Sequence, residues 1–188
     1  MSYVEEVIQE LSKLSDYFSD QVDVLAHKIG FTVRNGSNVY IAGNGGSAST
    51  AQHFSVDLIS VGKLSQRTTL PIYDLTSNSA LMLAIGNDVS FQEVFAAQIG
   101  RLGTRGDLLI VFSASGKSPN LIRAVEVAKE LGLGTFGVLG FTGDDISLKV
   151  DDTFHCNLHS MNYGIAEDLH LSFAHAVTDS FRRILNAG

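Results

Sequence analysis

The residues of this sequence best suited to hold a ligand lie in two loops of small and hydroxyl-bearing side chains. The first, residues 43–47 (GNGGS), follows an apolar run and precedes a helical pattern. Glycines let a ligand approach the backbone, and the free N–H groups at a helix start attract an anion. The second loop, residues 113–118 (SASGKS), places Ser113, Ser115 and Ser118 beside another helix start. Three hydroxyls next to helix N–H groups predict a cradle for a phosphate monoester.

Other interpretations of the two loops remain open. The first loop has Ala48 where a dinucleotide-binding G-x-G-x-x-G pattern needs its third glycine, and the second lacks the glycine that a Walker motif needs five residues before Gly116. A glycine turn after a strand is often only a turn, and Ser118 could simply cap the next helix. Capping accounts for only one of the three serines, so we favour a phosphate cradle.

Two pairs of a histidine and a carboxylate could carry chemistry. His53 and Asp57 are four residues apart, so they share one face of a helix. Glu167 and His175 are eight residues apart on a second helical pattern, with His170 between them. If the two helices meet, the pairs could bind a divalent metal such as zinc, or could provide an acid and a base that move a proton beside a carbonyl group. Each pair could also be an ordinary polar contact, and the residues alone leave these alternatives open.

The elements that must position these residues alternate along the chain. Strands are predicted at Val39–Ala42, Pro71–Leu75, Leu108–Phe112, Thr135–Leu139 and Phe154–Leu158, and helices at 80–85, 91–102, 121–131, 146–149 and 165–185. This alternation is typical of an α/β protein with an open parallel sheet and helices on both faces. We therefore expect a three-layer αβα sandwich with a five-stranded parallel sheet. Ligands bind beyond the carboxyl ends of such strands, so both loops should lie at one rim.

An amphipathic stretch precedes the first strand. Ser2 and Glu5 form a capping-box pattern, and apolar residues then recur at steps of three and four as far as Ile29. We predict one long helix, or two with a break, within residues 1–36. The helix could cover the core, or its apolar stripe could form an oligomer contact. We favour the oligomer contact because the stripe is similar to the seam of a helical bundle.

Composition and charge narrow the class of protein. The chain has 188 residues, of which 45% are hydrophobic and 18% charged, as expected for one globular domain over residues 1–188. A net charge of −7 argues against nucleic-acid binding. Cys156 is the single cysteine, so no internal disulfide can form, and no apolar run is long enough to span a membrane. The acidic start, MSYVEEV, is unlike a signal peptide. We expect a soluble protein of the cytoplasm.

Several segments resemble the phosphoheptose isomerase family in order and spacing. They are GNGGSASTAQHF, NSALMLAIGND, VFAAQI, GDLLIVFSASGKSPN and EDLHLSFAH, which together span nearly the whole chain. Members of that family are sugar isomerase (SIS) domain proteins with a flavodoxin-like fold. They convert sedoheptulose 7-phosphate to D-glycero-D-manno-heptose 7-phosphate, an aldose–ketose isomerisation in carbohydrate metabolism. The resemblance implies the same fold and reaction here, and a homotetramer with active sites between subunits.

The resemblance also implies roles for individual residues. A zinc ion, one per subunit, would be held by His53, Asp57, Glu167 and His175, of which Asp57 and His175 would be the acid/base pair of an enediol mechanism. The implied substrate-binding residues are Asn44, Gly45, Ser47, Asn87, Asp88, Ser113, Ser115, Ser118 and Glu167.

Several positions depart from the usual pattern of the family, among them Gly62-Lys63-Leu64, where the family has Gly-Arg-Phe, and Ile165, where it has arginine. Asp57 stands where the family has glutamate, Glu167 where it has glutamine, and Ala114 where it has threonine. The alternative function is that of relatives without catalysis, which bind a phosphosugar and a protein partner such as the bacterial replication initiator. The presence of His53 and His175, with acids at 57 and 167, favours the enzyme.

Overall fold

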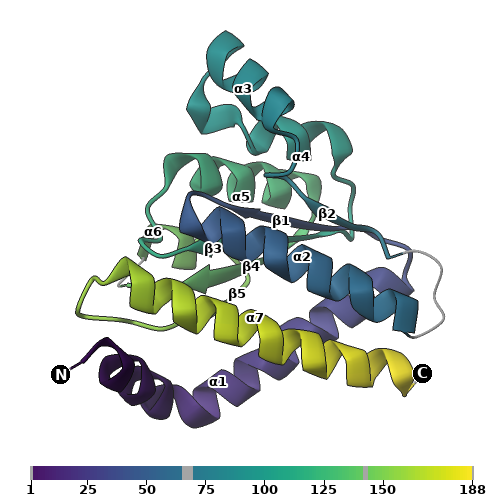
Figure 1. Cartoon of the computed structure of the whole chain (residues 1–188). Coiled ribbons are helices and arrows are strands. Elements are labelled where there is room, and N and C mark those ends of the chain that lie inside the picture. The colour runs from purple at the N-terminus through teal and green to yellow at the C-terminus, as the bar shows by residue number, and fades with distance from the viewer. Residues whose placement is uncertain (1, 65–69, 142–143, 188) are drawn as a thin grey trace.

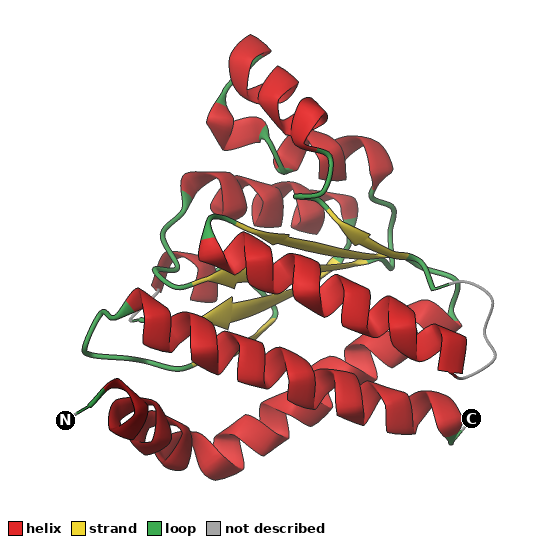
Figure 2. Ribbon diagram, viewed as in Figure 1, coloured by secondary structure: helices red, strands yellow, loops and turns green. Residues whose placement is uncertain are grey.

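Five parallel strands form the central sheet of the computed structural model, which describes residues 2–64, 70–141 and 144–187 (Figures 1 and 2). The strands are β1 (Val39–Gly43), β2 (Ile72–Asp74), β3 (Leu108–Ser113), β4 (Gly134–Leu139) and β5 (Asp152–His155). Their order across the sheet is β2-β1-β3-β4-β5, which is the flavodoxin-like order. The predicted five-stranded parallel sheet is confirmed.

The register of β1 and β3 places the two candidate loops side by side. Gly43, the last residue of β1, lies opposite Phe112 near the end of β3. The chain leaves β1 toward β2 on one side and returns as β3 on the other, so the strand order reverses between β1 and β3. The crevice at such a reversal is where open α/β sheets bind ligands.

Helices cover both faces of the sheet. One face carries α1 (Tyr3–Arg34), α2 (Gly46–Leu64) and α7 (Tyr163–Asn186). The other carries α3 (Ser79–Asp88), the 3₁₀ helix η1 (Phe91–Glu93), α4 (Ala96–Leu102), α5 (Pro119–Leu131) and α6 (Asp144–Ser147). The three-layer arrangement is visible in Figure 1.

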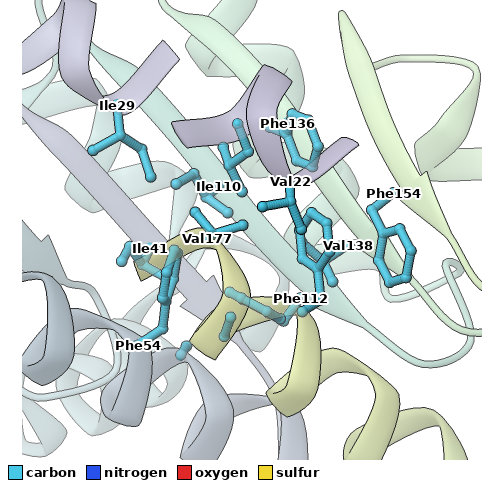
Figure 3. Packing of buried hydrophobic residues seen from close by; sticks show 14 of the residues in the cluster. Val22, Ile29, Ile41, Phe54, Ile110, Phe112, Phe136, Val138, Phe154 and Val177 are labelled. Carbon is cyan, nitrogen blue, oxygen red and sulfur yellow. The ribbon is translucent and has the colours of Figure 1, made fainter. Parts of the chain in front are cut away.

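A separate hydrophobic core lies on each face because successive strand residues point to opposite sides. From β3, Ile110 and Phe112 enter the core beneath α1, α2 and α7, whereas Leu109 and Val111 enter the core beneath α4 and α5. Figure 3 shows Phe112 among residues of the first core. Strands that are buried on both faces appear in the sequence as continuous apolar runs, which is why they could be predicted.

The long N-terminal helix α1 is continuous from Tyr3 to Arg34. Its predicted capping box is confirmed, because the Ser2 side chain accepts from the Glu5 N–H and the Glu5 carboxylate accepts from the Ser2 N–H at 2.7 Å. The second half of α1 is buried against α7 and the sheet, whereas Val4 and Ile8 in the first half are exposed. One half of the helix therefore covers the core.

Several predicted boundaries differ from the structure. The stretch 91–102 is divided between η1 and α4, and β5 begins two residues before its predicted start at Phe154. The predicted helix 80–85 extends as α3 to Asp88. Among the described helices, none combines the length and apolar character that a bilayer crossing requires.

Candidate functional site

A cavity of about 260 Å³ lies between the two loops at the carboxyl ends of β1 and β3. Residues 44–47 form one wall and residues 112–115 with Ser118 form another. Tyr163 and Glu167, from the first turns of α7, also line the cavity. Six of the predicted substrate-binding residues therefore line the same cavity as Glu167: they are Asn44, Gly45, Ser47, Ser113, Ser115 and Ser118.

The first loop is shaped by two glycines. Gly45 has a left-handed φ of +55°, which favours glycine, and α2 begins at the next residue, Gly46. A methyl group on Gly46 would collide with the carboxylate of Glu167. The start of α2 is therefore open to close approach by an acidic group, and helix N-termini favour negative charge there.

The hydroxyls of the serine loop are oriented by its own backbone. Ser113 Oγ accepts a hydrogen bond from the Gly116 N–H at 3.0 Å, and Ser115 Oγ accepts one from the Lys117 N–H at 3.3 Å. A hydroxyl that accepts in this way keeps its hydrogen to donate to another group. Ser118 is the N-cap of α5, but its side chain makes no capping bond to described residues. All three hydroxyls can thus donate to a phosphate oxygen.

Helices α2 and α7 meet and bring three of the predicted metal ligands together. Asp57 Oδ2 lies 3.3 Å from His53 Nε2 and 3.4 Å from His175 Nδ1. One ligand atom from each residue lies within 4.8 Å of the others. Asp57 and His175 also line a cavity of about 300 Å³, and both histidine side chains are about half exposed, at 48% and 52%. The group is accessible to a small molecule.

Glu167, the fourth predicted metal ligand, is placed differently. Within the described residues it does not join the His53, Asp57 and His175 group. Its carboxylate lies against Gly46 and lines the cavity of the serine loop. The structure therefore positions Glu167 on the side of its other predicted role, substrate binding.

Asn87 and Asp88 lie away from both groups. They end α3, are exposed, and bond to each other, with Asn87 Nδ2 donating to Asp88 Oδ1 at 2.8 Å. Every residue of α3 is described and none is buried, since the helix stands out from the sheet (Figure 1). Within one chain, these two predicted substrate residues do not reach the cavity.

His170 belongs to the core rather than to the site. It is fully buried, and its ring centroid lies 6.2 Å from that of Phe112. Burial lowers the pKa of His170 to about 4, so the imidazole is neutral at physiological pH.

A larger cavity, of about 670 Å³, adjoins the first and shares Asn44, Gly45 and Ser118 with it. Asn120 lines this larger cavity and bonds to Asn44. Sequence reasoning missed Asn120, although its place directly after Ser118 and Pro119 at a helix start was a usable signal.

Comparisons with known proteins agree with this architecture. Residues 2–140 match the sequence model of the SIS domain family. The chain is 32% identical over 184 residues to a phosphoheptose isomerase from Nitratidesulfovibrio vulgaris strain Hildenborough, covering 95% of this chain and 87% of that protein. It is 40% identical over 139 residues to a phosphoheptose isomerase from Geotalea daltonii, covering 74% and 70%.

Solved structures give the same result. A phosphoheptose isomerase from Francisella tularensis superimposes with a TM-score of 0.88 at 28% identity, covering 96% of this chain and 95% of that one. A phosphoheptose isomerase from Neisseria gonorrhoeae gives a TM-score of 0.81 at 28% identity, covering 94% and 91%.

Proposed function

Because the chain belongs to the phosphoheptose isomerase family of SIS domain proteins, we propose that it converts sedoheptulose 7-phosphate to D-glycero-D-manno-heptose 7-phosphate. The observation that carries the proposal is that helix α7 contributes to both groups: Glu167 lines the hydroxyl-rich cavity, and His175 belongs to the His–Asp–His group that α7 forms with α2. Eight residues separate Glu167 at the cavity from His175, a rise of about 12 Å. An extended seven-carbon sugar with its phosphate spans roughly 10 Å, which suits this separation.

The serine loop holds the phosphate in this proposal. Ser113, Ser115 and Ser118 donate their hydroxyl hydrogens to phosphate oxygens, and the N–H groups at the starts of α2 and α5 add to the attraction. The phosphate then fixes the far end of the sugar, so C1 and C2 are directed toward Asp57 and His175.

Asp57 and His175 move the protons of the isomerisation. The ketose carries its carbonyl at C2. A base removes a proton from C1, which gives an enediol, and the same proton is returned to C2. Meanwhile O2 gains a proton and O1 loses one, so the product carries its aldehyde at C1. Asp57 and His175 share these transfers, since Asp57 Oδ2 lies 3.4 Å from His175 Nδ1. We assign the carbon-bound proton to the Asp57 carboxylate and the oxygen-bound protons to His175.

Zinc, one per subunit, is part of the proposal. Two imidazole nitrogens and a carboxylate oxygen within 4.8 Å of one another form a donor set that zinc accepts. His53, Asp57 and His175 would hold the ion, with a substrate oxygen as the fourth ligand, because Glu167 lies about 12 Å from His175 along α7. A bound zinc would polarise the sugar carbonyl.

We also infer a homotetramer in which a neighbouring subunit completes each site. Asn87 and Asp88 are exposed at the end of α3, together with the exposed apolar side chains of Leu83, Val89 and Phe91. A group of exposed apolar side chains of this kind is typical of a surface that a second copy of the chain covers. The single cysteine, Cys156, is buried and suits a reducing compartment, so we propose a cytoplasmic location.

The test is conversion of sedoheptulose 7-phosphate, followed by NMR of the product, with the Asp57→Asn and His53→Ala variants. Asp57→Asn keeps the shape but removes the basicity, so turnover should be lost while phosphosugar binding is kept. His53→Ala should lose zinc by elemental analysis. Arg183→Ala is the control for general disturbance of α7, because Arg183 is exposed and is not among the described residues that line the cavity of Asp57 and His175.

Three outcomes would count against the proposal. A fully active Asp57→Asn enzyme would show that another group is the base. Wild-type protein that binds the phosphosugar without converting it would point instead to the non-catalytic, partner-binding class. If the wild-type protein contained no zinc after purification and reconstitution, the proposed zinc site would be wrong.

A further inference from the structure

Two asparagine side chains form a closed pair between the loops at the phosphate end of the site. Asn44 Nδ2 donates to Asn120 Oδ1 at 2.9 Å, and Asn120 Nδ2 donates to Asn44 Oδ1 at 2.9 Å. Asn44 follows β1, whereas Asn120 is the second residue of α5, directly after the serine loop. One side-chain pair thus joins the loop after β1 to the first turn of α5, the helix that follows the serine loop.

A third hydrogen bond, made by Asn120, fixes the orientation of both side-chain amides. The backbone N–H of Leu121 donates to Asn120 Oδ1 at 3.0 Å. An N–H can only donate, so the oxygen of Asn120 must face Leu121 and its nitrogen must face Asn44. Asn120 is 2% exposed, so water does not compete for this arrangement. The start of α5 therefore sets which way the Asn44 amide points.

The pair leaves Asn44 with unused hydrogen-bonding capacity. A primary amide has two N–H donors and an oxygen with two lone pairs, and the pair uses one of each. Asn44 is only partly buried and lines both the smaller and the larger cavity, whereas Asn120 lines only the larger one. The second N–H of Asn44 is thus available to a ligand, while Asn120 is held behind it.

We propose that Asn120 is a positioning residue, which acts through Asn44 to present one amide N–H to the phosphosugar. If the pair were broken, the Asn44 amide could rotate and direct its carbonyl oxygen at an anion. The loss of one hydrogen bond to a charged group weakens binding by about tenfold or more. The catalytic group on α2 and α7 would be unaffected, so the effect should appear in KM rather than in kcat. The kinetic part rests on the proposed function, but the binding part does not.

The first experiment compares Asn44→Ala, Asn120→Ala and the double variant. Asn120→Ala should raise the KM for sedoheptulose 7-phosphate about tenfold with kcat changed by less than about threefold. If Asn120 acts only through Asn44, the double variant should be no worse than Asn44→Ala. Asn38→Ala is the matched control, because Asn38 Nδ2 donates to Asp107 Oδ2 at 3.3 Å and joins two chain segments at the amino ends of β1 and β3, away from the cavities at their carboxyl ends. It should leave KM unchanged.

The second experiment uses Asn120→Asp and its dependence on pH. The new carboxylate can still accept from Leu121 and from Asn44 Nδ2, but its other oxygen faces the Asn44 oxygen, so two acceptors meet. Protonation of the carboxyl group restores a donor at that position. The ratio of the variant's KM to the wild-type KM should therefore fall as the pH is lowered from 8 to 5. The described residues lining the larger cavity include no acid, base or histidine, and Glu167 of the smaller cavity is present in both proteins, so its titration cancels in the ratio of the two KM values.

The outcomes separate this proposal from the proposed function. A wild-type KM in folded Asn120→Ala, additive effects in the double variant, or a pH-independent ratio for Asn120→Asp would each overturn it. If the wild-type protein does not convert sedoheptulose 7-phosphate, the proposed function fails. The same variants are then compared by calorimetric binding of that compound, where equal affinities for wild type and Asn120→Ala would overturn the positioning role.

Discussion

At the scale of single residues, the serine hydroxyls give a direct test of the phosphate cradle. Ser115→Ala and Ser118→Ala should each weaken phosphosugar binding by roughly 1.5–3 kcal/mol, because each removes one hydrogen bond to a charged group. Loss of an N-cap side chain usually costs about 1 kcal/mol of stability. Ser118 makes no capping bond with described residues, so its replacement should cost less than that.

Calorimetry and urea unfolding would measure the two effects separately. Ser12→Ala is a suitable control, because among the described residues the Ser12 hydroxyl bonds within its own helix α1, where it donates to Ile8 O. Unchanged affinity in Ser115→Ala would remove that residue from the cradle.

Glu167 gives a second prediction at this scale. Its carboxylate lines the same cavity as the three serines, where it repels a phosphate dianion. Glu167→Gln should therefore tighten phosphosugar binding several-fold, measured by titration calorimetry. Asp168→Asn is the matched control: it removes the same charge one residue away, where the carboxylate accepts from the Tyr3 hydroxyl at 2.7 Å. Equal effects of the two variants would show that only the overall charge matters.

At the scale of elements, α7 combines a catalytic face with a buried, neutral histidine. The unfolded chain binds a proton at His170 below pH 6.5, whereas the folded protein does so only below a pKa of about 4. The stability due to neutral His170 is therefore complete above pH 6.5 and is lost as the pH falls toward 4. This group alone should make the protein about 2 kcal/mol less stable at pH 5 than at pH 7.

Urea unfolding at the two pH values, for wild type and His170→Phe, would test this linkage. The phenylalanine variant should lose that part of the pH dependence, whatever its absolute stability. An identical pH dependence in both proteins would contradict the assignment.

The elements also show how far sequence reasoning reaches. Buried strands were predictable because they are short apolar runs, and α5 was predictable because Pro119 and Gly132 delimit it. The division of residues 91–102 into η1 and α4 was not predictable, since that break carries no glycine or proline.

In the site, the spacing of four residues placed His53 beside Asp57, but their contact with His175 depends on how α2 packs on α7. The same packing puts Glu167 on Gly46, which no local pattern encodes.

At the scale of the whole molecule, substitutions in the exposed first half of α1 would test whether this helix joins the subunits of the proposed tetramer. Val4 and Ile8 are 64% and 59% exposed, whereas Leu11 and Leu14 pack partly against the core of their own chain. Glutamates at Val4 and Ile8 should therefore dissociate a tetramer without unfolding the subunit. Light scattering after size-exclusion chromatography would give the mass of the assembly.

Activity should fall with the assembly if neighbouring subunits supply Asn87 and Asp88. Leu148→Glu is the control, because Leu148 is 84% exposed on the opposite layer, next to α6. A folded double variant that keeps the tetrameric mass would refute the α1 contact.

The packing of α1 on α7 has a consequence for biosynthesis. Helix α1 is made early and α7 late, yet the two helices and α2 together cover one core. Until the ribosome has synthesised α7, the apolar faces of α1 and of the sheet remain exposed to solvent. This period is long because translation adds only about 5–20 residues per second. The nascent chain is therefore exposed to aggregation for seconds, and it gains its cooperative fold only when α7 emerges.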